Sequence, residues 1–164
     1  MQEKQQKGCS GCLGALGFIL LIGIAAGAWF GYQEWRSGED QVARADGRVL
    51  LFGDTYTANG ISCSGAGEYQ MIGRDTSIAI VANDDALLTT VLSAGMVLDN
   101  GACEFTFFGD VDVHDRYQVV IGEDLNTIEA ACRPGSVPVT ETSSGQTARF
   151  LIHIDAGGPA CVQP

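Results

Sequence analysis

Lysine is nearly missing from this chain of 164 residues, and none occurs after Lys7. Beyond residue 33 the chain carries 19 acidic residues and seven basic ones, all arginine, which gives a net charge of −12. A surface with this charge repels phosphate backbones, so nucleic-acid binding is not expected. It also disfavours docking on anionic lipid. The same charge can attract cations or a basic partner, or simply keep an exposed domain soluble.

Motifs of catalysis are also missing. The sequence has two histidines, His114 and His153, and contains no G-x-S-x-G, S-x-x-K or H-E-x-x-H pattern. The glycine-rich stretch SGAG after Cys63 lacks the lysine and the following helix of a phosphate-binding loop. No pair of carboxylates stands out as an acid and a base. We therefore predict that this protein is not an enzyme.

One uncharged run, residues 13–32 (LGALGFILLIGIAAGAWFGY), predicts a single transmembrane α-helix. Its length is what a helix needs to cross a hydrocarbon core of about 30 Å. Lys4 and Lys7 precede the run and Arg36 follows it. The positive-inside rule then favours a cytoplasmic tail over residues 1–12 and an extracytoplasmic position for the rest of the chain. This predicts localisation at the cell membrane, with the lipid bilayer as a partner.

A cleaved signal peptide is the alternative to a retained anchor. Ala26-Gly27-Ala28 resembles a small-residue cleavage site, and the mature chain would then begin at Trp29 as a secreted soluble domain. The apolar run continues past this site to spanning length, which favours retention. Both alternatives export the same domain.

Glycines recur every four residues within the predicted helix, at Gly23, Gly27 and Gly31. This spacing lines one helix face with small residues and predicts close packing against a protein partner or a second copy. In the tail, Cys9 and Cys12 form a C-x-x-C pair, which is only half of a tetrahedral zinc site. We interpret this pair as two thiols beside the membrane, and their role stays open.

Four cysteines fall in the exported part: Cys63, Cys103, Cys132 and Cys161. An even number in an exported domain predicts two disulfides, for which three connectivities are possible. We favour Cys63–Cys103 with Cys132–Cys161, because each pair ties segments within a plausible sheet neighbourhood. A zinc site is a weaker interpretation, since these spacings contain no C-x-x-C pair.

The exported part divides into a polar linker or stalk, residues 33–46, and one domain, residues 47–164. Strand patterns in the domain cover 48–57, 76–82, 87–92, 103–108, 116–122 and 148–154. Residues 125–132 fit a helix or a strand, 134–145 fit a loop, and Asn59-Gly60 and Asn83-Asp84-Asp85 are turn signals. Short strands with no long amphipathic helix predict a mainly β protein, an antiparallel β-sandwich, with a small β-barrel as the alternative.

Several motifs follow one another in the domain: Cys63-x-Gly65-x-Gly67-x-Tyr69, then Cys103-x-Phe105-x-Phe107, then Tyr117-x-Val119. This order resembles the exported domains of small actinobacterial membrane-anchored proteins of unknown function. Glu68, Met71 and Asp75 depart from that pattern, and the final third of the chain is not covered. The later motifs are also similar to transthyretin-like and Cna-B-type sandwich modules. The resemblance implies a surface β-domain with a Cys63–Cys103 disulfide, and it supplies no catalytic residues.

The densest polar cluster is GDVDVHD, with Asp110, Asp112, His114 and Asp115. Carboxylates at alternate positions can hold Ca²⁺, and this predicts a candidate metal site at Asp110, Asp112 and Asp115. The glycine and closing glutamate of an EF-hand are missing, so a solvated loop is the alternative. No other cofactor is expected.

These observations predict a single-pass cell-envelope protein whose outer domain acts as a non-catalytic interaction or accessory subunit. One alternative is an extracytoplasmic module that binds a cation or a small ligand. The other is a secreted soluble domain left after signal-peptide cleavage.

Overall fold

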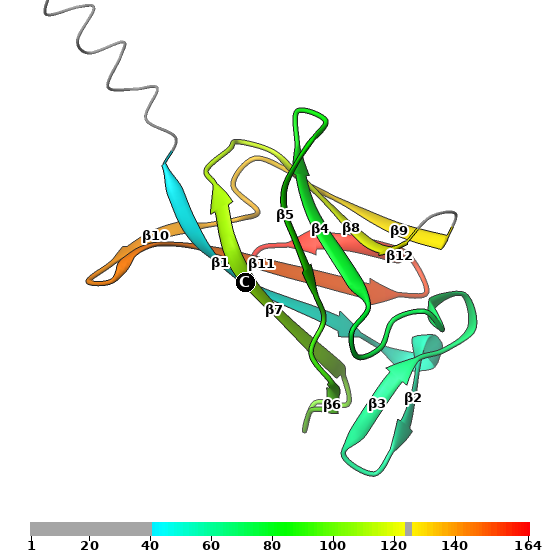
Figure 1. Cartoon of the computed structure of the whole chain (residues 1–164). Coiled ribbons are helices and arrows are strands. Elements are labelled where there is room, and N and C mark those ends of the chain that lie inside the picture. Colours follow the sequence, from blue (N-terminus) through cyan, green and yellow to red (C-terminus); the bar gives the residue numbers. More distant parts are fainter. Residues whose placement is uncertain (1–40, 124–125) are drawn as a thin grey trace, which may run out of the picture. The chain divides into compact units, whose positions relative to one another are not determined.

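A computed structural model describes residues 41–123 and 126–164 of the chain (Figure 1). The predicted transmembrane segment lies outside this part, as do the glycines of its helix face and the tail cysteines (Gly23, Gly27, Gly31, Cys9, Cys12). Among the described residues, no helix has the length and the hydropathy to span a bilayer.

The described residues are mainly β, with two short 3-10 turns and no α-helix. The first half contains β1 (Val42–Leu51), η1 (Gly53–Thr55), β2 (Tyr56–Asn59), β3 (Ser62–Gly65), η2 (Gly67–Tyr69), β4 (Ser77–Ala82) and β5 (Asp85–Val91). The second half contains β6 (Gly95–Val97), β7 (Cys103–Asp112), β8 (Tyr117–Glu123), β9 (Asn126–Cys132), β10 (Val139–Thr142), β11 (Gly145–Asp155) and β12 (Gly158–Val162).

These strands form two sheets that share one hydrophobic core, an arrangement compatible with a β-sandwich. The larger sheet has the order β10-β11-β1-β7-β6-β3-β2, with β12 also paired to β11. The smaller sheet has the order β5-β4-β8-β9. The expected antiparallel pairing holds for all of these pairs except β1 and β11, which run parallel. These two strands come from opposite ends of the domain, so no short connection forces them to be antiparallel.

The core is built from strands that bury every second residue. Phe105 and Phe107 on β7 are fully buried, as are Val119 and Ile121 on β8. Gly47 on β1 makes room for this packing, because a Cβ atom at that position would collide with the Phe107 ring. The predicted strands around these residues are therefore confirmed, with their inward faces as expected.

Both disulfides have the favoured connectivity. Cys63–Cys103 joins β3 to the start of β7 within the larger sheet. Cys132–Cys161 joins β9 of the smaller sheet to β12 of the larger one. The second bond therefore fastens the two sheets together along one edge.

The domain begins earlier than the sequence pattern predicts. Residues 42–46, assigned there to a stalk, form the first half of β1, and Ala43 and Ala45 are fully buried. Arg44 and Asp46 alternate with these alanines, and Arg44 is exposed on the outer side of the strand. The polar composition suggested a linker because inward-facing alanine is too small to give a strong hydrophobic signal.

Other differences arise where strands lack strong apolar alternation. The glycine-rich stretch at 62–67 forms β3 and the start of η2, and the GDVDVHD segment begins inside β7, which continues to Asp112. Residues 126–132 are a strand, and β10 forms within the expected loop at 134–145. The strand predicted at 148–154 is not the last, because β12 follows it and contains Pro159. An edge strand tolerates this proline, since it has a side that needs no hydrogen bond.

Candidate functional site: an acidic pocket between two 3-10 turns

Two 3-10 turns with the same local pattern lie near one end of β11. Each opens with a glycine at positive φ, Gly53 at 62° and Gly67 at 61°. An acidic residue and then a buried one follow, Asp54 before Thr55 in η1 and Glu68 before Tyr69 in η2. In each turn the acidic side chain is exposed, and the buried residue that follows it holds the turn against the domain.

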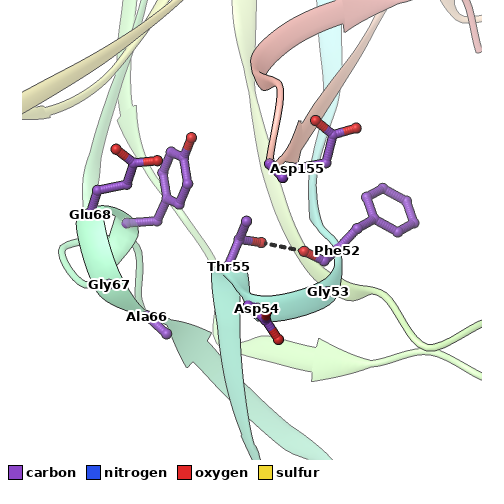
Figure 2. Close-up of a pocket in the computed structure, with 10 residues that line it drawn as sticks. Phe52, Gly53, Asp54, Thr55, Ala66, Gly67, Glu68 and Asp155 are labelled. Carbon is purple, nitrogen blue, oxygen red and sulfur yellow. Dashed lines mark hydrogen bonds between the residues drawn. The ribbon is translucent and has the colours of Figure 1, made fainter.

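Hydrogen bonds fix η1 against its surroundings. The Phe52 N–H donates to the Ile154 carbonyl at 3.0 Å, which ties the residue after β1 to β11. The buried Thr55 hydroxyl donates to the Phe52 carbonyl at 2.9 Å, a bond drawn in Figure 2. The Ala66 N–H donates to the Thr55 carbonyl at 2.8 Å and so links the chain entering η2 to η1. The two turns are therefore held as one unit.

A cavity of about 570 Å³ lies at this unit, and we call it the acidic pocket (Figure 2). Its principal lining side chains are Phe52, Asp54, Thr55, Glu68, Tyr69 and Asp155. Three of them are carboxylates, and none of the described residues that line the pocket is basic. The ion pairs found among the described residues, Arg48–Glu104 and Arg74–Asp75, involve none of these three carboxylates. The pocket therefore carries uncompensated negative charge.

The electrostatics of Tyr69 reflect this environment. Tyr69 is only 6% exposed, and burial is the main cause that raises the pKa of its hydroxyl. The neighbouring Glu68 carboxylate and the charge of Asp155 raise this pKa further. Tyr69 therefore stays neutral at physiological pH and keeps a proton that it can donate.

Asp155 and Phe52 are both held in place. One oxygen of Asp155, Oδ1, accepts a hydrogen bond from the Gly157 N–H at 2.7 Å, which orients the carboxylate. The Phe52 ring packs against His153, with ring centroids 5.1 Å apart. The pocket thus combines carboxylates with an aromatic ring, a set of groups suited to an organic cation.

The predicted calcium ligands lie at and just beyond the end of β7. Asp110 and Asp112 lie in β7, alternate along it and are not buried, while Asp115 lies beyond the end of this strand. Side chains at alternate positions of a strand share one face, so Asp110 and Asp112 lie on the same side of β7. Within residues 41–123 and 126–164, no three His, Cys, Asp or Glu side chains are grouped so that they could hold a metal ion.

His114, which belongs to the same polar cluster, contacts Tyr117 at the turn between β7 and β8. The His114 backbone N–H donates to the Tyr117 hydroxyl at 2.7 Å, and this hydroxyl donates to the Asp112 carbonyl at 3.2 Å. The two rings meet edge to face, with centroids 6.2 Å apart. These contacts close the turn between β7 and β8, so the GDVDVHD segment shapes a connection.

The acidic pocket is not evident from the sequence. Its carboxylates come from three separate segments, at Asp54, Glu68 and Asp155, and only the fold places them around one pocket, with Asp54 directed away from the other two (Figure 2). One signal was present, the repeated pattern of glycine, acid and inward residue at 53–55 and 67–69. That pattern is short, and nothing in the sequence alone shows that the two turns meet.

The fold and the pocket define the class of this protein as a mainly β domain with two disulfides and an acidic pocket. Comparison with protein-family models, with curated proteins and with solved structures finds no match. The comparisons therefore do not bear on the resemblance to actinobacterial membrane-anchored proteins.

Proposed function

We propose that this protein is a single-pass cell-envelope protein that presents its β domain outside the membrane as a non-catalytic interaction module. The uncharged run at 13–32 supports an anchor, because its length suits a bilayer. The two disulfides support an oxidising compartment outside the cytosol. A secreted form that begins at Trp29 would present the same domain.

We further propose that the acidic pocket binds a cationic side chain, arginine or lysine, of a partner protein. The observation that carries this proposal is the group of three carboxylates with no basic residue among the described lining residues. A guanidinium carries five N–H donors and can bind a carboxylate with two parallel hydrogen bonds. It can also stack on an aromatic ring such as that of Phe52. Arginine therefore fits this set of groups better than a bare metal ion.

The test is a nuclear magnetic resonance titration of the full-length chain with N-acetyl-arginine methylamide. We expect shifts concentrated at the backbone amides of residues 53–55, 66–69 and 155–157. The citrulline analogue, which lacks the charge, should leave these signals in place. Binding should weaken as salt is added, because the carboxylates are partly exposed to solvent.

Two double variants separate the pocket from the general charge of the domain. Asp54→Asn with Glu68→Gln should abolish the shifts. Asp85→Asn with Asp99→Asn removes the same charge from exposed positions outside the pocket and should leave them unchanged. Equal weakening by both double variants would show non-specific attraction and would overturn the pocket as the binding site.

A further inference from the structure

The outer edge of β2 is an open sheet edge that is short but carries no charge, proline or bulge. Edge strands commonly carry a charge, a proline or a bulge, which prevents pairing with other chains. The other edge strands of the two sheets have such features: Glu141 in β10, Pro159 in β12, Glu129 in β9, and Asp85 with a pairing irregularity in β5. Strand β2 has the sequence YTAN, with no charge and no proline, and its pairing with β3 is regular.

The strands around this edge are uncharged in a strongly acidic domain. We call β2, β3 and β6 the neutral arm, because residues 55–67 and 95–97 include no charged side chain. Glu68 follows directly after the first of these ranges. Residues 41–164 as a whole carry 16 acidic residues and six arginines. The neutral arm also exposes two large apolar side chains, Ile61 at 80% and Met96 at 52%. In Figure 1 the β2–β3 hairpin projects from the lower right of the domain.

The backbone of β2 has hydrogen-bonding groups to offer along this edge. Asn59 and Ser62 flank a two-residue turn and form the first pair of the hairpin. Hydrogen-bonded and non-hydrogen-bonded pairs alternate in an antiparallel ladder. The N–H and C=O groups of Ala58 and Tyr56 therefore point away from β3, and among the described residues no strand pairs with them.

We infer that β2 pairs with β2 of a second copy of this chain, antiparallel and around a twofold axis. An antiparallel edge is complementary to itself, as a twofold interface requires. Ala58 of each copy then bonds with Tyr56 of the other, and Thr57 lies opposite Thr57. Two domains with this negative charge repel each other over most of their surface, whereas the neutral arms bring no carboxylates face to face. Unlike the proposed function, this inference does not involve the acidic pocket.

Cysteine cross-linking of the full-length chain tests this register. Thr57→Cys is introduced where Cys9 and Cys12 are replaced by serine, so that no other free thiol remains. Opposed residues of a non-hydrogen-bonded pair have Cα atoms about 4.5 Å apart, which suits a disulfide. We expect mild oxidation to convert most of the Thr57→Cys chain to a covalent dimer. Thr140→Cys, exposed on edge strand β10, is the matched control and should stay monomeric.

A second variant tests the pairing without a thiol. Ala58→Pro removes the N–H that points away from β3 and keeps the hydrogen bonds between β2 and β3. Association should therefore be lost. The melting temperature should stay within a few degrees of wild type. Sedimentation velocity of the full-length chain in mild detergent measures the association, in a Gly27→Ile background so that the predicted helix face does not contribute. Thr57→Lys is an independent variant that introduces no proline into the hairpin. It places two like charges face to face across the twofold axis, so it should also abolish association. A monomeric wild type, or equal cross-linking at residues 57 and 140, would overturn the inference.

Discussion

The body of the domain and the neutral arm follow the same pairing rules but are stabilised differently. In the body, β1, β7, β8 and β11 bury alternate side chains in a common core. In the neutral arm, β2 buries none of its four residues, and the buried positions of β3 and β6 are glycines, Gly65 and Gly95. The arm is held by backbone hydrogen bonds and by Cys63–Cys103.

Because the body is buried and the arm is exposed, substitutions in the body affect stability, whereas substitutions in the arm affect contacts with other molecules. Side chains of the body are committed to packing, so a change there alters the free energy of unfolding. Side chains of the arm are mostly exposed, so the arm can vary its contacts with little effect on the core. The acidic pocket lies between these extremes, because η1 is bonded to the end of β11 in the body while η2 follows directly after β3.

The largest expected effect comes from the body. Phe107→Ala removes a fully buried ring that packs near Phe150, with ring centroids 6.2 Å apart. It should lower the free energy of unfolding by about 3–5 kcal/mol, because it leaves a cavity. Phe108→Ala is the matched control, since the Phe108 side chain is 52% exposed on the opposite face of the same strand. Chemical denaturation measures both, and equal losses would contradict the assigned inward face of β7.

The second effect compares the two disulfides. Replacing Cys63 and Cys103 with alanine opens a loop with a sequence separation of 40, and we expect a loss of about 2–4 kcal/mol. Hydrogen exchange should then show residues 56–65 losing protection before β1 and β11 do, because the arm has little core packing. Replacing Cys132 and Cys161 instead should loosen β9 and β12, where the two sheets are joined. Loss of protection in the same residues by both double variants would contradict this division.

The sequence predicted the body well and the neutral arm poorly. Cys103, Phe105 and Phe107 alternate with polar residues, and Ile78 and Ile80 alternate with the smaller residues Ser77 and Ala79, so these faces follow from a period of two. The Asn83-Asp84 turn was also predicted, and both residues have positive φ, 51° and 68°. In β3, by contrast, serine and glycine give no hydrophobic signal. That strand exists because β2 and β6 pair with it.

Long-range pairings explain the remaining differences. Nothing local indicates that β11 lies parallel to β1, since this pairing joins residues about a hundred positions apart. The acidic pocket depends on the same contact, because β11 brings Asp155 beside η1. The favoured disulfide connectivity was within reach of the sequence because only three pairings were possible. The calcium hypothesis for Asp110, Asp112 and Asp115 relies on their spacing along the chain, and it stays a prediction.

A smaller effect tests the arm's own turn. Gly60 has φ of 66° and no atom within contact range of an added Cβ, so Gly60→Ala introduces backbone strain alone. We expect a loss of about 1–2 kcal/mol, the cost of a left-handed residue with a side chain. Gly73→Ala is the matched control, since its surroundings are equally open and its φ is not positive. If thermal unfolding shows equal effects at both positions, the hairpin turn does not require glycine.

The smallest expected effect is a pH dependence of the folding stability that arises from Tyr117 on β8, in the body. Burial is the main cause that raises the pKa of Tyr117, the charges of Asp112 and Asp115 raise it further, and a hydrogen bond from the His114 backbone opposes them. A raised pKa in the folded state means that the unfolded chain releases this proton more easily. The contribution of Tyr117 to stability is therefore complete below the ordinary tyrosine pKa of 10.0 and is lost as the pH rises through the folded value.

Melting temperatures of the wild type and of Tyr117→Phe between pH 8 and pH 11 should show this loss. The variant should be less stable than the wild type near neutral pH, by about 1 kcal/mol, because it lacks the hydroxyl bonds to His114 and Asp112. Its melting temperature should then fall less steeply above pH 10, since phenylalanine cannot ionise. Parallel curves for the two proteins would place the alkaline sensitivity elsewhere, and the other tyrosine with a raised pKa, Tyr69 in the acidic pocket, would be the next to test.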